Sequence, residues 1–121
     1  METIKRFQPD TETWIEEGCH IVELHNTEMD AECSIARARL EPGRTTRLHC
    51  LRGILERYVI IEGMGEVSVG DQPPQTVREL DVVNIPAGMS QSISNTARTD
   101  LIFLCICTPR FRVEHYRDLG P

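Results

Sequence analysis

The sequence has little positive charge and few aromatic residues. Its 121 residues include 13 Lys and Arg against 19 Asp and Glu, which gives a formal net charge of −6 at pH 7, and aromatic residues make up only 5%. Proteins that bind nucleic acids need clustered positive charge to neutralise phosphates. The composition therefore predicts no nucleic-acid partner.

Long apolar runs and paired cysteines are also missing. The longest apolar stretch, residues 101–107, is too short to cross a bilayer, so no membrane partner is expected. The five cysteines are odd in number and form no CxxC pair, and the opening METIKRFQPD lacks the apolar stretch of a secretion signal. We therefore expect free thiols and a cytoplasmic location.

Short apolar or alternating runs, separated by turn residues about every 8–12 positions, dominate the chain. Strands are predicted over residues 19–25, 32–40, 47–51, 56–61, 66–70, 76–80, 81–85, 90–94 and 100–106. Only the tail, residues 111–120, has helical spacing. The sequence thus predicts one all-β domain over residues 1–121, a jelly roll or small barrel closed by a short C-terminal helix.

The alternation within strands places polar residues in rows, because residues two apart in a strand share a face. If the rows face inward, His49, Glu56 and Gln91 meet inside the barrel. Periodicity alone does not say which face is inward. The rows are Arg47, His49 and Leu51; Glu56, Tyr58 and Ile60; and Met89, Gln91 and Ile93.

Residues 43–63 resemble the first conserved motif of the cupins, G-x5-H-x-H-x(3,4)-E-x6-G. Gly43, His49, Glu56 and Gly63 stand at the motif positions with the correct spacing. Leu51 replaces the second histidine.

Residues 80–95 resemble the second cupin motif, G-x5-P-x-G-x2-H-x3-N. The spacing again holds, but Leu80 stands at the first glycine and Gln91 replaces the histidine. Two motifs in order, in a chain that reads as all-β, imply a double-stranded β-helix, which is the jelly-roll barrel of the cupins. The resemblance says less about activity, because one fold hosts many functions.

The resemblance implies a metal site with a reduced set of ligands. Cupins usually offer three histidines and one glutamate, and this chain keeps His49 and Glu56, with Gln91 able to offer an amide oxygen. Zinc, manganese, nickel or iron could bind such a set, and no organic cofactor is expected. One imidazole fewer than iron oxygenases use favours Lewis-acid chemistry over oxygen chemistry. Tyr58 and Arg47 are the candidate catalytic residues beside the metal.

Two classes of function stay open. The first is a metal-dependent isomerase, cyclase or lyase that acts on a small oxygen-rich substrate in the barrel. The second is a metal-free ligand-binding or regulatory cupin, which Leu51 favours, with His49, Glu56 and Gln91 as ordinary buried polar residues. Small cupins usually pair and an open sheet has edges to protect, so a homodimer is expected in either case.

Overall fold

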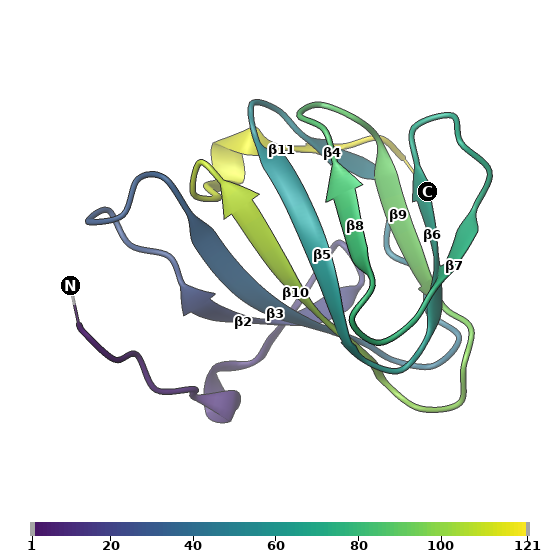
Figure 1. The fold of residues 1–121 in the computed structure, drawn as a ribbon, viewed down its shortest axis with the longest axis horizontal. Coiled ribbons are helices and arrows are strands. Elements are labelled where there is room, and N and C mark those ends of the chain that lie inside the picture. The colour runs from purple at the N-terminus through teal and green to yellow at the C-terminus, as the bar shows by residue number, and fades with distance from the viewer. Residues whose placement is uncertain (1, 121) are drawn as a thin grey trace.

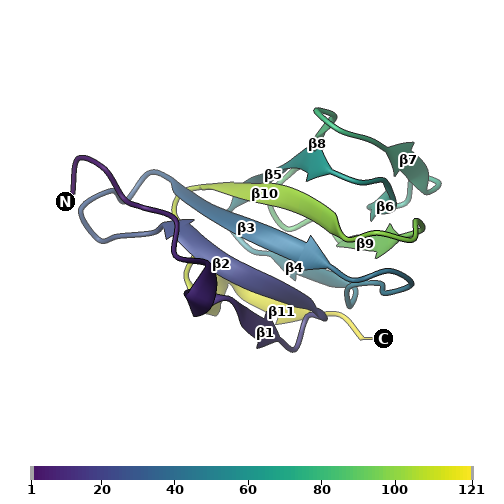
Figure 2. The ribbon, with the colours of Figure 1, turned by 90° about the horizontal axis from the view of Figure 1, so that it is seen from below.

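A computed structural model describes residues 2–120. Its strands form two antiparallel sheets that face each other, as Figure 1 and Figure 2 show. The six-stranded sheet has the order β1 (Thr13–Ile15), β2 (Cys19–His25), β3 (Ser34–Leu40), β10 (Leu101–Thr108), β5 (Leu55–Glu62) and β8 (Val82–Ile85). The five-stranded sheet has the order β11 (Tyr116–Asp118), β4 (His49–Leu51), β9 (Gln91–Asn95), β6 (Gly65–Val69) and β7 (Gln75–Val77). The predicted all-β jelly-roll barrel is confirmed.

The predicted rows of side chains point into the barrel except at Arg47 and Met89, whose side chains are exposed. Glu56, Tyr58 and Ile60 on β5 are all buried, and so are Gln91 and Ile93 on β9. Their outward neighbours are more exposed, as the alternation of a half-buried strand requires. The apolar core lies between the sheets around the largest of these side chains, Tyr58, Phe103, Leu40, Ile60, Ile85, Ile93 and Leu101.

The two ends of the chain supply the elements that the sequence reading did not predict. The strands β1 and β11 are only three residues long each. Helical structure in the tail is confined to the 3-10 helix η2 (Val113–His115), because the next three residues pair with β4 and are therefore extended. A second 3-10 helix, η1 (Pro9–Thr11), precedes β1. Within residues 2–120, no helix is long and apolar enough to cross a membrane.

Two motif positions have backbone conformations that explain the glycines of the family pattern. Gly63 has φ +89°, and a Cβ at this position would lie 2.7 Å from the carbonyl oxygen of Asp100. Leu80 has φ +69° although it is not a glycine. A bulky side chain is strained in that region, so the replacement of glycine by Leu80 has a cost in stability.

Candidate functional site

A cavity of about 150 Å³ lies between the six-stranded sheet and β4. Leu51, Cys105 and Phe111 contribute to its apolar wall, together with side chains from β1, β2 and β3. Its polar and ionisable walls come from Glu17, Glu23, Ser34, His49 and Glu56. The cavity therefore contains two of the three residues that the cupin spacing predicted as metal ligands.

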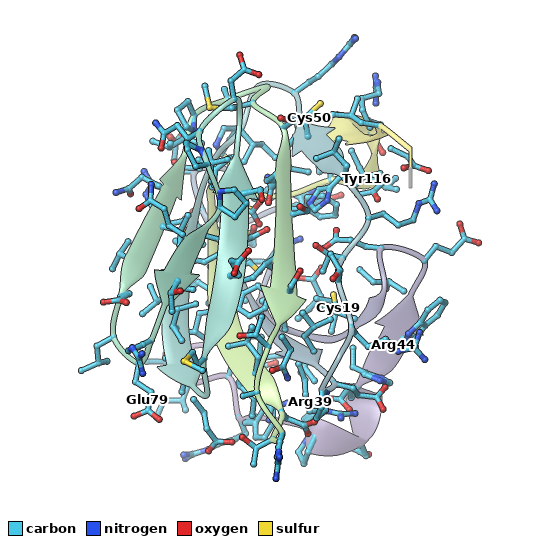
Figure 3. The ribbon with its side chains drawn as sticks, turned by 90° about the vertical axis from the view of Figure 1, so that its right-hand side faces the viewer. Cys19, Arg39, Arg44, Cys50, Glu79 and Tyr116 are labelled. Carbon is cyan, nitrogen blue, oxygen red and sulfur yellow. The ribbon has the colours of Figure 1, made fainter. Side chains whose placement is uncertain are left out.

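His49 is 2% exposed, and its surroundings determine which ring nitrogen carries the proton. Its Nδ1 lies 2.7 Å from the carbonyl oxygen of Arg47. A carbonyl can only accept, so Nδ1 carries the hydrogen and Nε2 keeps its lone pair. Burial lowers the pKa of His49, which favours this neutral form. The imidazole ring of His49 also stacks on the ring of Tyr116, with 5.3 Å between the two centroids. Tyr116 is labelled in Figure 3.

Glu56 has one carboxyl oxygen with a partner and one without. Its Oε2 lies 3.8 Å from the thiol of Cys107, which donates to it, whereas the buried Oε1 has no hydrogen-bond partner. Burial raises the pKa of Glu56 to about 7, and the nearby amide of Gln91 works in the opposite direction. A buried carboxyl oxygen without a partner is costly, so it marks a place where a ligand or water is needed.

Gln91 is fully buried and lies on β9 directly opposite His49. Its Oε1 accepts a hydrogen bond from the hydroxyl of Tyr58, while its Nε2 has no partner. In this arrangement the amide oxygen, which is the atom able to bind a metal, is already engaged. The unpaired atom of Gln91 is a donor.

Tyr58 and Arg47, the candidate catalytic residues, do not line the cavity. Tyr58 is buried against Phe103, with 4.7 Å between ring centroids, and reaches the site only through Gln91. The guanidinium of Arg47 lies 2.9 Å from Asp118 on the outside of the barrel. The alternation did not extend to Arg47, because β4 begins at His49.

Glu17 is the site residue that the sequence reading missed. It lies on the turn between β1 and β2, and its Oε1 is 3.4 Å from Nε2 of His49. Burial raises the pKa of Glu17 to about 7. The only local sequence signal was an acidic pair, Glu16 and Glu17, before Gly18, and such a pair is usually a solvated turn.

The chain matches no family model. Over 71 residues it is 38% identical to a curated Thermotoga maritima protein named oxalate-binding protein, with 59% of this chain and 58% of that protein covered. The match thus spans little more than half of this relative. A solved structure described as a predicted oxalate decarboxylase, also from Thermotoga maritima, is 31% identical, with 75% of this chain and 80% of that chain covered and a TM-score of 0.70.

A third protein supplies the name of the fold. A cupin 2 conserved barrel domain protein from Salinispora arenicola has a TM-score of 0.75 over 88% of each chain, at 15% identity. This chain belongs to the cupins.

This cupin has an incomplete set of donor atoms for the metal that the family implies. Among the described residues, no three His, Cys, Asp or Glu side chains are grouped so that they could hold an ion. Leu51 lines the cavity at 4% exposure, where the motif has its second histidine. Nε2 of His49 and Oε1 of Glu56 are the ligand atoms left from the predicted set, since the oxygen of Gln91 is engaged.

Proposed function

We propose that this cupin binds a small polar molecule in the cavity beside His49 and Glu56. The observation that carries the proposal is Oε1 of Glu56, a buried carboxyl oxygen without a partner on a residue that lines the cavity. Such an atom costs roughly 1–3 kcal/mol if it stays unpaired. A ligand that donates a hydrogen bond would satisfy it; Nε2 of Gln91 also has no partner, but Gln91 does not line the cavity.

The comparisons support small-molecule binding without identifying the ligand. The two Thermotoga maritima proteins are named for binding oxalate and for oxalate decarboxylation. Those names describe these relatives, and this cupin has one of the usual histidine positions filled by Leu51. We therefore expect a ligand of similar size, a few heavy atoms, with its own chemistry.

The residues of the site divide into those that contact the ligand and those that position them. Glu56 and His49 are the proposed contacts. Tyr58 is the proposed positioning residue for Gln91, because its hydroxyl holds the amide oxygen. Arg47 acts through its backbone, whose carbonyl orients the His49 ring, so its side chain has no proposed part in binding.

Calorimetry and NMR titration with oxalate, glycolate, glycerol and 2-aminoethanol test this proposal. At least one should bind, and Glu56→Gln should weaken it about tenfold or more, as expected for loss of a charged hydrogen-bond partner. Glu62→Gln is the matched control, since Glu62 is on the same strand but exposed. Saturating concentrations of all four compounds without a change in the signals of His49 or Glu56 would overturn the proposal.

A divalent-metal enzyme of the isomerase, cyclase or lyase type is the second candidate. The observation in its favour is that Nδ1 of His49 donates to a carbonyl, which leaves Nε2 free to bind a metal. Metal content after purification without chelators, and thermal melts with and without EDTA, test this candidate. A bound metal should raise the melting temperature by mass action, and a protein that is metal-free yet binds its ligand fully would remove it.

We propose β1 as the contact surface of the predicted homodimer. This strand is at the edge of the six-stranded sheet, and its Trp14 is 52% exposed. An exposed edge with a large apolar side chain favours pairing with another copy. Light scattering that shows a clean monomer at micromolar concentration would contradict this expectation.

A further inference from the structure

Two acceptor atoms face each other at the wall of the cavity. Nε2 of His49 keeps its lone pair, because Nδ1 donates to the Arg47 carbonyl, and Oε1 of Glu17 lies 3.4 Å from it. Burial raises the pKa of Glu17 to about 7, so below this pH the carboxyl group of Glu17 can itself donate a hydrogen to Nε2. Above it, the lone pair and the ionised carboxylate repel each other, and a ligand with positive charge relieves this repulsion.

The backbone holds this contact in place from both sides. The N–H of Arg47 donates to the carbonyl of Glu17 at 2.8 Å, and the carbonyl of Arg47 accepts from His49. The turn is closed by the N–H of Gly18, which donates to Ile15 at 2.9 Å. Gly18 has φ +107°, a conformation that glycine adopts without strain. The turn therefore presents Glu17 to His49 as a fixed part of the barrel.

The wall of the cavity is acidic. Glu17, Glu23 and Glu56 line it, and no Lys or Arg is among the lining residues of the described chain. Glu56 is 6% exposed and leaves Oε1 without a partner. A free dicarboxylate such as oxalate would bring two negative charges to this wall without a cation to offset them.

We infer that Glu17 is a ligand-contacting residue and that, with Glu56, it makes the site select ligands that carry a positively charged group. The inference rests on the proposed function and names its ligand class. The cationic group lies against Glu17 and Nε2 of His49. Leu51, which lines the same cavity, has no polar atom in its side chain to compete for this group. It is an organic ammonium group, since the described residues contain no cluster of three His, Cys, Asp or Glu side chains that could hold a metal ion.

The test compares three probes of similar size on EDTA-treated protein at pH 8, by NMR titration. The probes are 2-aminoethanol, which is cationic; ethane-1,2-diol, its neutral match; and oxalate, which is a dianion. A separate arm titrates Mn²⁺ alone. The wild type should bind 2-aminoethanol roughly tenfold or more tightly than the diol, because a charged hydrogen bond is worth about that factor. Oxalate should bind most weakly.

The variant Glu17→Gln separates a contact from a structural role. It keeps the shape of the side chain, should lower the affinity for the cationic ligand about tenfold, and should raise the affinity for oxalate. Loss of structure would lower the affinity for all probes together. Loss of charge alone should change the affinities for 2-aminoethanol and for oxalate in opposite directions. Glu16→Gln, an exposed neighbour on the same turn, should change neither affinity.

The outcomes distinguish this inference from the proposed function. A wild type that binds oxalate or the diol more tightly than 2-aminoethanol overturns the inference and leaves small-molecule binding intact. A folded Glu17→Gln protein with unchanged affinities also overturns it. Binding of Mn²⁺ without binding of 2-aminoethanol overturns it as well, because the cation would then be a metal. A wild type that binds none of these probes, and neither glycolate nor glycerol, overturns both the inference and the proposed function.

Discussion

Two hollows in the barrel, the cavity beside His49 and a hollow between β6, β7 and β8, differ in the charge of the side chains that line them. The cavity beside His49 measures about 150 Å³ and contains three glutamates and an imidazole. A hollow between β6, β7 and β8 measures about 380 Å³ and is lined by Val67, Val77 and Met89 among others, with no ionisable side chain in its lining. The larger space can therefore orient a ligand only through the neutral amides of Gln72, Gln75 and Asn84. The smaller one has ionisable groups and a buried carboxyl oxygen without a partner, and for this reason we propose it as the functional end.

The largest difference expected between the two ends is in pH dependence. Burial raises the pKa of Glu56 from 4.5 to about 7, so the folded protein holds this proton more tightly than the unfolded chain. Its contribution to stability is fully present below pH 4.5 and is lost as the pH rises through about 7. The shift corresponds to roughly 3 kcal/mol of unfolding free energy.

Urea unfolding of wild type and Glu56→Gln from pH 4.5 to pH 8 measures this effect. The difference in unfolding free energy between the two proteins should grow with pH in favour of the variant. Burial also lowers the pKa of His49 and raises that of Glu17 to about 7, and the comparison with Glu56→Gln removes much of the contribution of both groups. Two parallel stability profiles would show that Glu56 is not buried as described.

Replacing Leu51 by histidine should increase the affinity of the cavity beside His49 for zinc. Leu51 lines the cavity with His49 and Glu56, so Leu51→His adds an imidazole to their donor atoms. Replacing a residue that only hydrogen-bonds to a metal ligand typically alters metal affinity by about 10–100-fold, and a new ligand should do at least as much. Leu51→Met is the control of similar volume. Zinc calorimetry on folded protein measures both, and equal affinities would mean that position 51 does not face the site.

A smaller gain in stability is expected from Leu80, which lines neither space. Its φ of +69° favours glycine, and its side chain is exposed, so little packing is lost on truncation. Leu80→Gly should stabilise the protein by about 1 kcal/mol, because the relief of strain exceeds the added freedom of the unfolded chain. Thermal melting should show a rise of a few degrees. A fall in melting temperature would mean that the strain is absent.

The smallest effect is expected at the end without ionisable side chains. Val82 lines the larger hollow but is 53% exposed. Val82→Ser should change the unfolding free energy by less than about 0.5 kcal/mol, as for most exposed positions. It should leave every ligand affinity unchanged. If Val82→Ser alters binding as strongly as Glu56→Gln does, the two ends are not functionally distinct.

Much of the fold was predictable because its signals are local. The strand predicted over residues 19–25 coincides with β2, and those predicted over 56–61 and 100–106 differ from β5 and β10 by one or two residues at each end. Alternation and turn residues act over a few positions, so they can be recognised in the sequence. The short strands β1 and β11 have too few residues for a periodic signal. They form because they pair with β2 and β4, respectively.

The site was predictable only where a motif recorded its spacing. His49 and Glu56 stand in the cupin pattern and do line the cavity. Arg47 shared the same sequence row, but its side chain reaches Asp118, 71 positions away, which no local pattern indicates. Glu17 stands in no motif and meets His49 because a backbone hydrogen bond holds the turn against the residues before β4.

The sequence by itself determined the longer strands, the barrel and the motif positions of His49, Glu56, Leu51 and Gln91, since hydrophobic alternation and motif spacing are properties of the chain. The tertiary structure decided which face is inward, which nitrogen of His49 is free and that Glu17 joins the site. It also decided the raised pKa values of Glu17 and Glu56. These depend on burial and on charges close in space, and burial exists only once the two sheets have closed over the cavity.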